Sequence, residues 1–326
     1  MMILKQPKKW ALALTLTASS FALAGCPTAK DTAPDTNIDA TVSAADLGRR
    51  IETLASDDME GRMPGTRGGQ MAKQYIADEM KRAGLVPMGD NGTYFQNVEL
   101  TEATVLPSSS MVISKGGNTL VSVTEDASEA VFWTKRLDDT VTVADSDMVF
   151  VGYGVNAPEY GWNDYAGLDV KGKTVVMLVN DPGFATKDEN LFKGNAMTYY
   201  GRWTYKFEEA ARQGATAALV IHETEPASYG WDVVSGSWTG AQNDLVRPDR
   251  GASRAALEGW LHLDAATKLF DAAGLNYQEL KAKAAVKGFE PVAMPGLNLS
   301  ATINQTVKTT ESANVAGGIK GTTHPD

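Results

Sequence analysis

Residues 54–87 read LASDDMEGRMPGTRGGQMAKQYIADEMKRAGLVP, a glycine-punctuated polar loop followed by an amphipathic pattern. Thr66 is placed to cap a helix, because its side-chain oxygen can accept a hydrogen bond from a free backbone N–H of the first turn. The apolar residues that recur at spacings of three and four on one face are Ala72, Tyr75, Ile76 and Met80. Gly84 and Pro87 then end the pattern. The stretch predicts a loop held in place by a well-capped helix.

Composition sets broad limits on the rest of the chain. Its 326 residues can form one large domain or two ordinary ones, and a hydrophobic fraction of 43% is normal for a globular protein. The formal net charge of -10 argues against nucleic acid as a partner, because neutralising phosphates requires clustered lysine and arginine. The composition gives no signal for the oligomeric state.

The N-terminus has the pattern of a targeting signal. Lysines precede an apolar run over residues 10–24, which is shorter than the roughly 20 residues that span a bilayer and is typical of a secretory signal. Residues 23–26, LAGC, resemble the lipobox of bacterial lipoproteins, and Cys26 is then the lipid attachment site. The alternative is an ordinary signal peptide with a chance cysteine. We therefore predict a lipid-anchored protein of the bacterial cell envelope, joined to its membrane by a flexible tether over residues 26–42.

Folded structure is expected from Ser43, which opens a capping box with Asp46. Helices are also predicted over residues 202–213 and after Asp264 and Asn276. The predicted strands cover residues 94–100, 110–114, 119–123, 141–143, 148–150, 174–180, 217–222, 297–303 and 314–319. The order of strand, helix and strand over residues 174–222 predicts a parallel crossover.

No complete catalytic or metal site can be assigned from the residues themselves. Hydrolytic zinc sites need three or four converging His, Asp, Glu or Cys side chains, and the histidines are His222, His262 and His324. None belongs to a zinc motif, apart from the loose spacing of His324 and Asp326, which we do not assign. His222 ends an apolar run and is expected to be an interior residue.

Two further motifs are incomplete. Gly152, Gly154 and Ala157 imitate a dinucleotide-binding fingerprint, but the residues that follow do not open the required helix. Ser237 does not stand in a GxSxG elbow. A serine triad that uses His222 stays a minor alternative.

A family resemblance is carried by several blocks of sequence. Residues 54–62, with Pro64, Gly65 and Thr66, resemble the N-terminal signature of the di-zinc aminopeptidase family, which includes bacterial leucyl aminopeptidases and, more distantly, glutamate carboxypeptidase. The blocks VGYG, YGWNDY and GKTVV, at residues 151–154, 160–165 and 172–176, resemble the protease-associated domain that many members carry as an insertion. Residues 200–211 are similar to the helix of that insertion, and residues 312–321 to the strand that returns to the peptidase domain.

The resemblance implies an α/β fold, with an incomplete peptidase α/β sandwich around a mixed sheet and an inserted β-rich protease-associated α/β domain. It divides the chain into a signal peptide (1–25), the tether (26–42), the first part of the peptidase domain (43–100), the insertion (101–297) and return strands (298–326). We expect the insertion to fold securely, and the flanking pieces to be less secure because isolated strand pairs are marginal in water.

Full-length members of the family bind two zinc ions and hydrolyse N-terminal peptide bonds of peptide or protein substrates. Their zinc ligands and glutamate base come after the position of Asp326, so this chain is predicted to bind no zinc and to be inactive by itself. The signature residues that the resemblance places near the cleft are Glu60, Gly61, Arg62, Gly65 and Thr66.

A second interpretation is a lipid-anchored, non-catalytic module that binds peptides or proteins through the protease-associated domain. The aromatic residues Tyr160, Trp162 and Tyr165 suggest a binding loop if they are exposed, since exposed aromatics anchor interfaces. The alternative is that these rings pack inside the insertion. A third possibility is a truncated gene product without a function.

Overall fold

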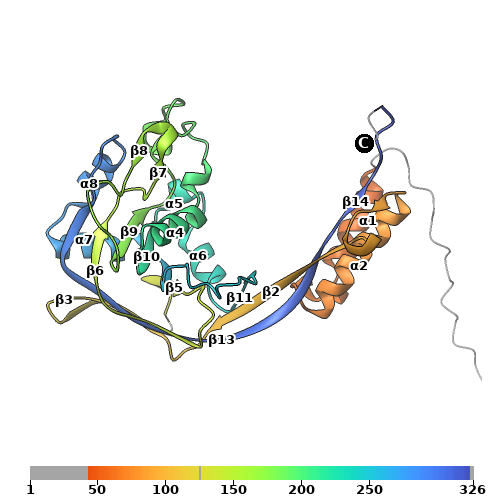
Figure 1. Cartoon of the computed structure of the whole chain (residues 1–326), viewed down its shortest axis with the longest axis horizontal. Helices are drawn as coiled ribbons and strands as arrows, with labels where there is room; N and C mark the ends of the chain where they lie inside the picture. The colour runs from red at the N-terminus through yellow and green to blue at the C-terminus, as the bar shows by residue number, and fades with distance from the viewer. Residues whose placement is uncertain (1–42, 125, 324–326) are drawn as a thin grey trace, which may run out of the picture.

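The computed structural model describes residues 43–124 and 126–323. The predicted signal peptide, the tether, Cys26 and the segment from His324 to Asp326 lie outside these ranges. Figure 1 shows a small and a large lobe, joined by a long ribbon of strands β2 (Phe95–Val105) and β13 (Val292–Val315). Among the described residues, no helix has the length and apolar character needed to cross a membrane.

The small lobe contains the two helices that the sequence predicted. Helix α1 (Ala44–Ala55) is capped by Ser43, whose hydroxyl accepts a 3.0 Å hydrogen bond from the backbone N–H of Asp46. Helix α2 (Arg67–Arg82) contains the buried Glu79, and Arg50 Nη1 of α1 lies 2.8 Å from Glu79 Oε2. The other elements of the lobe are η1 (Asp57–Arg62), β1 (Val86–Pro87), η2 (Asp90–Gly92) and β14 (Gly317–Gly318).

Apolar burial in the small lobe is slight. Its buried apolar side chains, among the described residues, are Met59, Ala72 and Ala77. Leu47 and Ile51, on the apolar side of α1, keep 51% and 57% of their surface exposed. A short antiparallel pair of β1 and β14 closes the lobe. That the flanking pieces are less secure than the insertion stays a prediction, and this low burial supports it.

The ribbon crosses both predicted domain boundaries. Strands β2 and β13 pair antiparallel from Val105 and Gln305 to Phe95 and Val315. Two separate strands were predicted over residues 297–303 and 314–319. Residues 297–303 and 314–315 belong to the single strand β13, and residues 317–318 form β14 directly after it. The prediction of two strands was wrong because the largely polar residues 305–313 also pair with β2, and their composition does not indicate this pairing.

The large lobe is built on a mixed sheet, which confirms the predicted α/β fold class. The strand order is β11-β2-β13-β6-β9-β10-β12-β5, with β3 and β4 attached beside β13. The strands β6, β9, β10 and β12 run parallel to one another, whereas β5, β11 and β13 pair antiparallel with their neighbours. The bounds are β3 (Ser110–Lys115), β4 (Asn118–Val123), β5 (Ala130–Trp133), β6 (Thr140–Phe150), β9 (Thr174–Leu178), β10 (Ala217–His222), β11 (Ala241–Leu245) and β12 (Leu257–His262).

Strand β6 is continuous where two short strands were predicted. Its register with β13 shifts between Leu299 and Ala301, and Asp145 has a φ of 51° at this point. The extra residue is a β-bulge, which reverses the alternation of apolar and polar side chains along the strand. The break in the alternation at Ala144 and Asp145 therefore marks a bulge and not a turn.

Helices cover both faces of the sheet, as Figure 1 shows. The segment from β9 through α4 to β10 is the predicted parallel crossover. Asn276 caps its helix as predicted, but the helix after β12 is capped by the ring of His262 and not by Asp264. The helices are α3 (Pro182–Thr186), α4 (Trp203–Arg212), α5 (Thr224–Ala227), α6 (Trp231–Ser237), α7 (Leu263–Ala273) and α8 (Tyr277–Ala284). The remaining short elements are β7 (Asn156–Ala157), η3 (Pro158–Tyr160), β8 (Trp162–Asn163) and η4 (Tyr199–Gly201).

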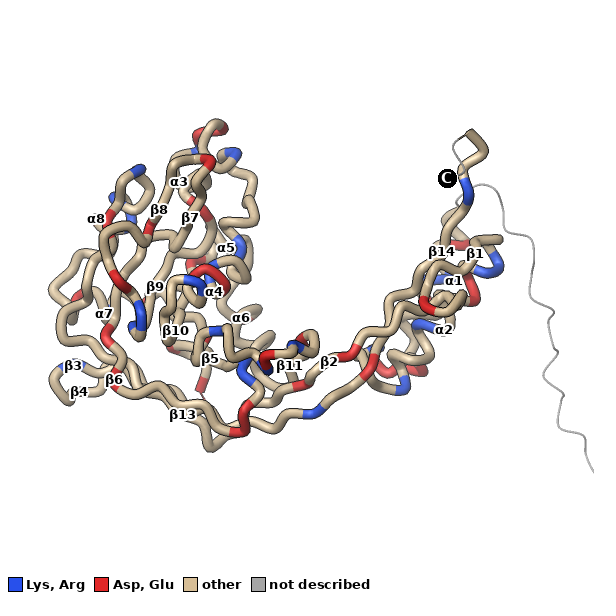
Figure 2. The backbone as a smooth tube through the Cα atoms, in the orientation of Figure 1, with Lys and Arg blue, Asp and Glu red and all other residues tan. Residues whose placement is uncertain are grey.

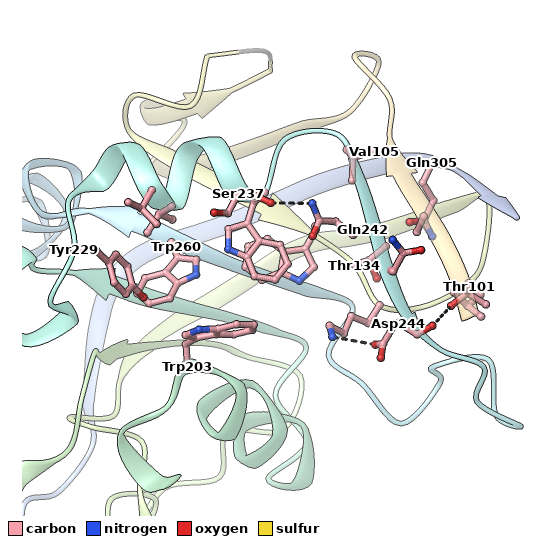
Figure 3. Close-up of a pocket in the computed structure, with 18 residues that line it drawn as sticks. Thr101, Val105, Thr134, Trp203, Tyr229, Ser237, Gln242, Asp244, Trp260 and Gln305 are labelled. Atoms are coloured by element: carbon pink, nitrogen blue, oxygen red, sulfur yellow. Dashed lines mark hydrogen bonds and ion pairs between the residues drawn. The ribbon is translucent and has the colours of Figure 1, made fainter. Parts of the chain in front are cut away.

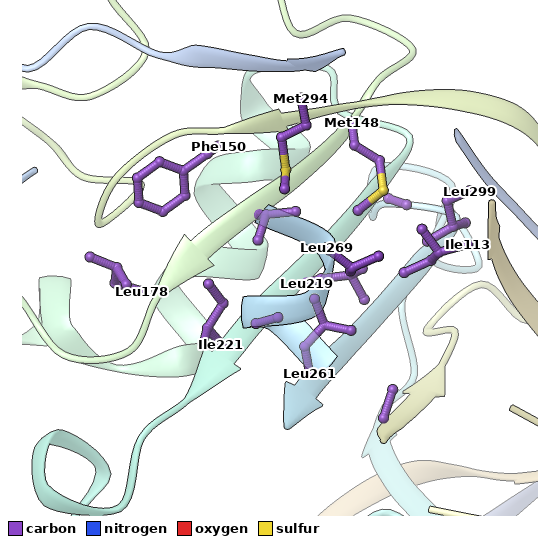
Figure 4. Close-up of a cluster of buried hydrophobic side chains, with 14 of the residues drawn as sticks. Ile113, Met148, Phe150, Leu178, Leu219, Ile221, Leu261, Leu269, Met294 and Leu299 are labelled. Atoms are coloured by element: carbon purple, nitrogen blue, oxygen red, sulfur yellow. The ribbon is translucent and has the colours of Figure 1, made fainter. Parts of the chain in front are cut away.

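The core of the large lobe lies on both sides of its central strands. Strand β10 alternates, so that Leu219 and Ile221 belong to the cluster beneath α7 and α8. Ala218 and Val220 belong to the cluster beneath α4 and α6. Figure 4 shows the first cluster, in which Phe150 packs with side chains of β9, β10 and β12. Burial of this extent supplies the main driving force for folding of the lobe.

Candidate functional site

The loop that carries the signature residues Glu60, Gly61, Arg62, Gly65 and Thr66, called the signature loop below, has an unusual backbone. Glu60, Gly61 and Arg62 follow one another with positive φ values of 49°, 76° and 62°. A non-glycine residue in this left-handed region costs on the order of 1–3 kcal/mol and persists only where its surroundings hold it there. Arg62 donates a hydrogen bond to the carbonyl of Leu54, and Arg67 pairs with the Glu60 carboxylate.

The loop is pressed against the start of α2. A Cβ atom on Gly68 would lie 2.0 Å from the carbonyl oxygen of Met59, and one on Gly69 would lie 2.3 Å from that of Met63. Thr66 Oγ1 accepts a 3.2 Å hydrogen bond from the N–H of Gly69, which is the predicted helix cap. These glycines are needed because any side chain would displace the loop.

The five signature residues therefore lie together in one loop of the small lobe. The loop also reaches the ribbon, since a Cβ on Gly65 would meet the Thr310 hydroxyl of β13. The Glu60 and Arg62 side chains are exposed. Their position beside a cleft stays a prediction.

His222 is the interior residue that the sequence predicted. It is 2% exposed, and its Nε2 lies 3.0 Å from the carbonyl oxygen of Tyr229. Burial lowers the pKa of the His222 ring, although the hydrogen bond to Tyr229 opposes the shift. Within residues 43–124 and 126–323, no group of three or more His, Cys, Asp or Glu side chains is arranged to hold a metal ion.

Two rings of the aromatic loop are buried, so the exposure that its interpretation as a binding loop required is not found. Trp162 and Tyr165 are only 2% and 5% exposed. Tyr160 stacks on Phe192, with 4.4 Å between ring centroids. These rings pack inside the large lobe because the loop folds back over the core, which is the alternative that the sequence left open.

A buried polar group fixes this loop. Asp164 accepts a 2.7 Å hydrogen bond from Trp162 Nε1 and a 3.0 Å bond from the N–H of Val155. Burial raises the Asp164 pKa to about 7 and lowers the pKa of the fully buried Lys206 to about 7. Lys206 Nζ donates to the carbonyl of Tyr153 at 2.5 Å. The Trp162 bond closes the loop on itself and the Val155 bond joins it to the segment before it, which assigns Asp164 a structural role.

A cavity that the sequence did not predict lies beside α4 and α6 of the large lobe. Its volume is about 460 Å³, and it contains four of the seven tryptophans of the chain. We call it the aromatic pocket, and its principal walls are Trp133, Trp203, Tyr229, Trp238, Trp260 and Gln305. Figure 3 shows Trp260 between Tyr229 and Trp203 at one end of the pocket, with Gln305 and Thr101 at the other.

The aromatic wall is rigid. Trp133, the last residue of β5, stacks on Trp238 with ring centroids 3.6 Å apart and planes within 5° of parallel. Trp203, at the start of α4, meets the same Trp238 ring edge-on at 5.2 Å. Aromatic contacts of this kind add about 0.5–1.5 kcal/mol each beyond the area that they bury. The residues beside the pocket are therefore held in place before any ligand binds.

Two buried polar atoms of the pocket lack a protein partner. Trp260 is 1% exposed, and its Nε1 donates no hydrogen bond. Gln305 is 3% exposed, and its Oε1 accepts none. A buried polar atom without a partner costs about 1–3 kcal/mol. Both atoms are enclosed by protein, so a ligand in the pocket does not reach them in this conformation.

The sequence offered one signal for this pocket, namely the concentration of tryptophans over residues 203–260. Spacing did not reveal it, because Trp133, Trp203, Trp238 and Trp260 come from different elements that only the sheet order brings together. Figure 2 shows basic and acidic residues interspersed along both lobes. The expectation that nucleic acid is not a partner stays a prediction.

No protein-family model matches the chain, and no curated protein matches it. Among solved structures, the chain is similar to an aminopeptidase from Aneurinibacillus sp. strain AM-1, with 20% sequence identity and a TM-score of 0.41. The match covers 85% of this chain and 48% of that one, so the chain spans about half the length of that aminopeptidase.

Proposed function

We propose that this chain is part of a zinc-dependent aminopeptidase of the bacterial cell envelope and that its small lobe borders the peptidase cleft. The observation that carries the proposal is the signature loop. Its sequence resembles the family signature, and two of its non-glycine residues, Glu60 and Arg62, have left-handed backbones. Backbone strain of this kind is concentrated at active sites and ligand clamps, where the fold must fix a loop in one position.

The residues of this chain are assigned a positioning role. The glycines at 65, 68 and 69 let the loop lie against α2 and β13, so the loop can form one rigid wall of a cleft. In the family, a pair of zinc ions activates the water that attacks the peptide bond. The described residues of this chain do not fit a zinc site, so no chemical step is assigned to them.

Zinc content and activity test the proposal at the level of the chain. The purified chain is expected to bind less than one zinc ion per molecule and to release no amino acid from leucine p-nitroanilide. Sequencing the gene beyond the codon for Asp326 tests the family assignment, and a His-x-Asp strand shortly downstream is the expected result. Stoichiometric zinc with amino-acid release by this chain would show that it holds a complete site.

The lipid anchor is tested separately. If Cys26 carries a lipid, a Cys26→Ser variant will move from the membrane fraction to the soluble fraction of lysed cells. Mass spectrometry of the wild-type N-terminal peptide should then find a diacylglyceryl group on Cys26. A wild-type protein that fractionates as soluble would leave the ordinary signal peptide as the better explanation.

A second candidate function is peptide binding by the large lobe without catalysis. The aromatic pocket favours it, because a cavity with aromatic and largely apolar walls has the usual character of a ligand site. This function is compatible with the first, since a peptidase needs a surface that positions its substrate.

A further inference from the structure

We infer that the ribbon of β2 and β13 is a hinge about which the small lobe moves as one body relative to the large lobe. The pivot is the strand pair Leu100–Thr310. The hinge goes beyond the proposed function and does not depend on zinc, because it follows from contacts within the described residues alone.

The ribbon is the connection between the two lobes. Among the residues that the structure describes, no hydrogen bond or ion pair joins residues 43–93 or 316–323 to residues 106–291. The small lobe contacts the ribbon instead: the N–H of Asn97 donates to the Asp90 carboxylate at 2.8 Å, and α2 and its flanking loop lie beside β13. Figure 1 shows α1 and α2 at the far end of the ribbon, away from the helices of the large lobe. Parts of a chain that share no extensive apolar interface are expected to move relative to one another.

Support from the large lobe ends close to one strand pair. Strand β11 pairs with β2 from Thr104 to Leu100, and the N–H of Val246 makes one more bond, to the Glu99 carbonyl at 3.3 Å. On the other side of the ribbon, the pairing of β6 with β13 ends at Asn304. Farther out, within the described residues, β2 and β13 pair with each other alone. Two-stranded ribbons adopt larger twists than wider sheets do, so bending is concentrated here.

Support from the small lobe begins at the same pair. A Cβ on Gly65 would meet the hydroxyl of Thr310, so the signature loop rests on the residue of β13 that pairs with Leu100. Farther along, the Lys73 ammonium of α2 lies 5.7 Å from the centroid of the Phe95 ring. The far half of the ribbon therefore turns with the small lobe, whereas β11 keeps the near half in the sheet.

Rotation about the pivot changes the distance between the signature loop and the large lobe. The loop is fixed to its own helix by the close approach of Gly68 and Gly69, so it moves without changing its internal conformation. In the proposed function this rotation would move one wall of the cleft. Hinge closure around a ligand is a common use of such a motion.

Distances between two spin labels, measured by pulsed electron–electron double resonance, test the hinge in the full chain carrying Cys26→Ser, which removes its own thiol. Glu52→Cys in α1 and Gln278→Cys in α8, both at exposed positions, label the two lobes. Asp232→Cys in α6 with Gln278→Cys is the control pair within the large lobe. The distribution between the lobes is expected to be at least about twice as wide as that of the control pair. A distribution as narrow as the control would overturn the hinge.

Two glycine substitutions in β13 test the position of the pivot. Thr310→Gly should widen the distribution between the lobes further, because glycine weakens a strand. Thr306→Gly is the matched control and should leave the width unchanged, since its partner Thr104 also pairs with Ala241 of β11. Equal widening by both variants would overturn the assignment of the pivot.

Hydrogen exchange distinguishes rotation of the small lobe from its unfolding. The amides of α1 and α2 should stay protected in the labelled chain without a glycine substitution, and this measurement stands even if Thr310→Gly fails to fold. Loss of protection in both helices would mean that the wide distribution comes from unfolding, which would also overturn the hinge. All samples contain EDTA, so these outcomes are separate from the zinc and activity measurements that test the aminopeptidase proposal.

Discussion

Lys135 Nζ lies 2.9 Å from Asp244 Oδ2, and this ion pair joins the two edges of the mixed sheet. Lys135 follows β5 at one end of the strand order, and Asp244 lies in β11 at the other end. Both side chains line the aromatic pocket and are about three-quarters buried. The pair therefore holds together the two strands between which the pocket is formed.

Replacing this pair should reveal the coupling between the two edges. Burial raises the Asp244 pKa, but the hydrogen bond and charge of Lys135 outweigh it, so the pKa lies below its usual value. Lys135→Met and Asp244→Asn are each expected to lower the free energy of unfolding by about 1 kcal/mol, with a coupling of about 0.5–1 kcal/mol in the double variant. Urea denaturation of the four proteins measures it. Strictly additive losses would show that the contact contributes nothing.

The tight approach of the signature loop to α2 gives a second prediction. Gly68→Ala places a methyl group against the Met59 carbonyl, which must move, and we expect a loss of about 2 kcal/mol or more in the small lobe. Gly48→Ala is the matched control, because Gly48 lies in α1 with nothing within 4 Å of its Cβ position. This substitution should stabilise the helix by up to about 1 kcal/mol.

Hydrogen exchange of the α2 amides is the suitable measurement for this pair of variants, since it reports on the small lobe alone. Faster exchange is expected for Gly68→Ala and unchanged or slower exchange for Gly48→Ala. If the α2 amides of both variants exchange at the same rate, the close approach of the signature loop to α2 does not stabilise the small lobe.

Burial of His222 predicts a pH dependence of stability. Its pKa is lowered in the folded protein, so below pH about 6.5 the unfolded chain binds a proton that the folded protein does not. Stability is therefore lost as the pH falls from this value towards the folded-state pKa. The loss amounts to about 1.4 kcal/mol for each unit of lowering.

His222→Gln isolates this contribution. Glutamine can still donate a hydrogen bond to the Tyr229 carbonyl but does not titrate, so the variant should lose less stability between pH about 7 and about 5 than the wild type. Thermal unfolding at the two pH values measures the difference. The same decrease in both proteins would mean that His222 is protonated in the folded state.

Local patterns predicted the longer helices α1, α2, α4, α7 and α8 and most strands, because capping residues and apolar spacing act within a few residues of sequence. The short helices α3, α5 and α6 and the strands β5, β11 and β12 were not predicted. Ser43, Thr66 and Asn276 cap their helices as expected. Two strands were predicted with wrong bounds because strand pairing between distant residues sets their length. The bulge at Asp145 and the polar half of β13 both follow from partner strands elsewhere in the sheet.

The two candidate sites also differ in how far the sequence could predict them. The signature residues are neighbours in the sequence, so their clustering in one loop could be predicted. The aromatic pocket could not, since its walls meet only after β5, β11 and β12 take their places in the sheet. Exposure was also unpredictable for the loop at Tyr160, because aromatic residues are equally suited to an interface and to a core.

The burial of that loop changes the expected effect of altering Trp162. Its ring packs edge-on against Phe192 at 5.6 Å, and its Nε1 donates to Asp164. Trp162→Ala should therefore lower the free energy of unfolding by about 3–5 kcal/mol, whereas Trp162→Phe should cost less because it keeps most of the packing. Tyr199→Ala, at a ring that is 57% exposed, serves as the control and should cost about 1 kcal/mol or less. Urea denaturation followed by circular dichroism measures all three. A Trp162→Ala protein of wild-type stability that no longer binds peptide would restore the interpretation of this loop as the binding site, because only an exposed ring can be removed without loss of core packing.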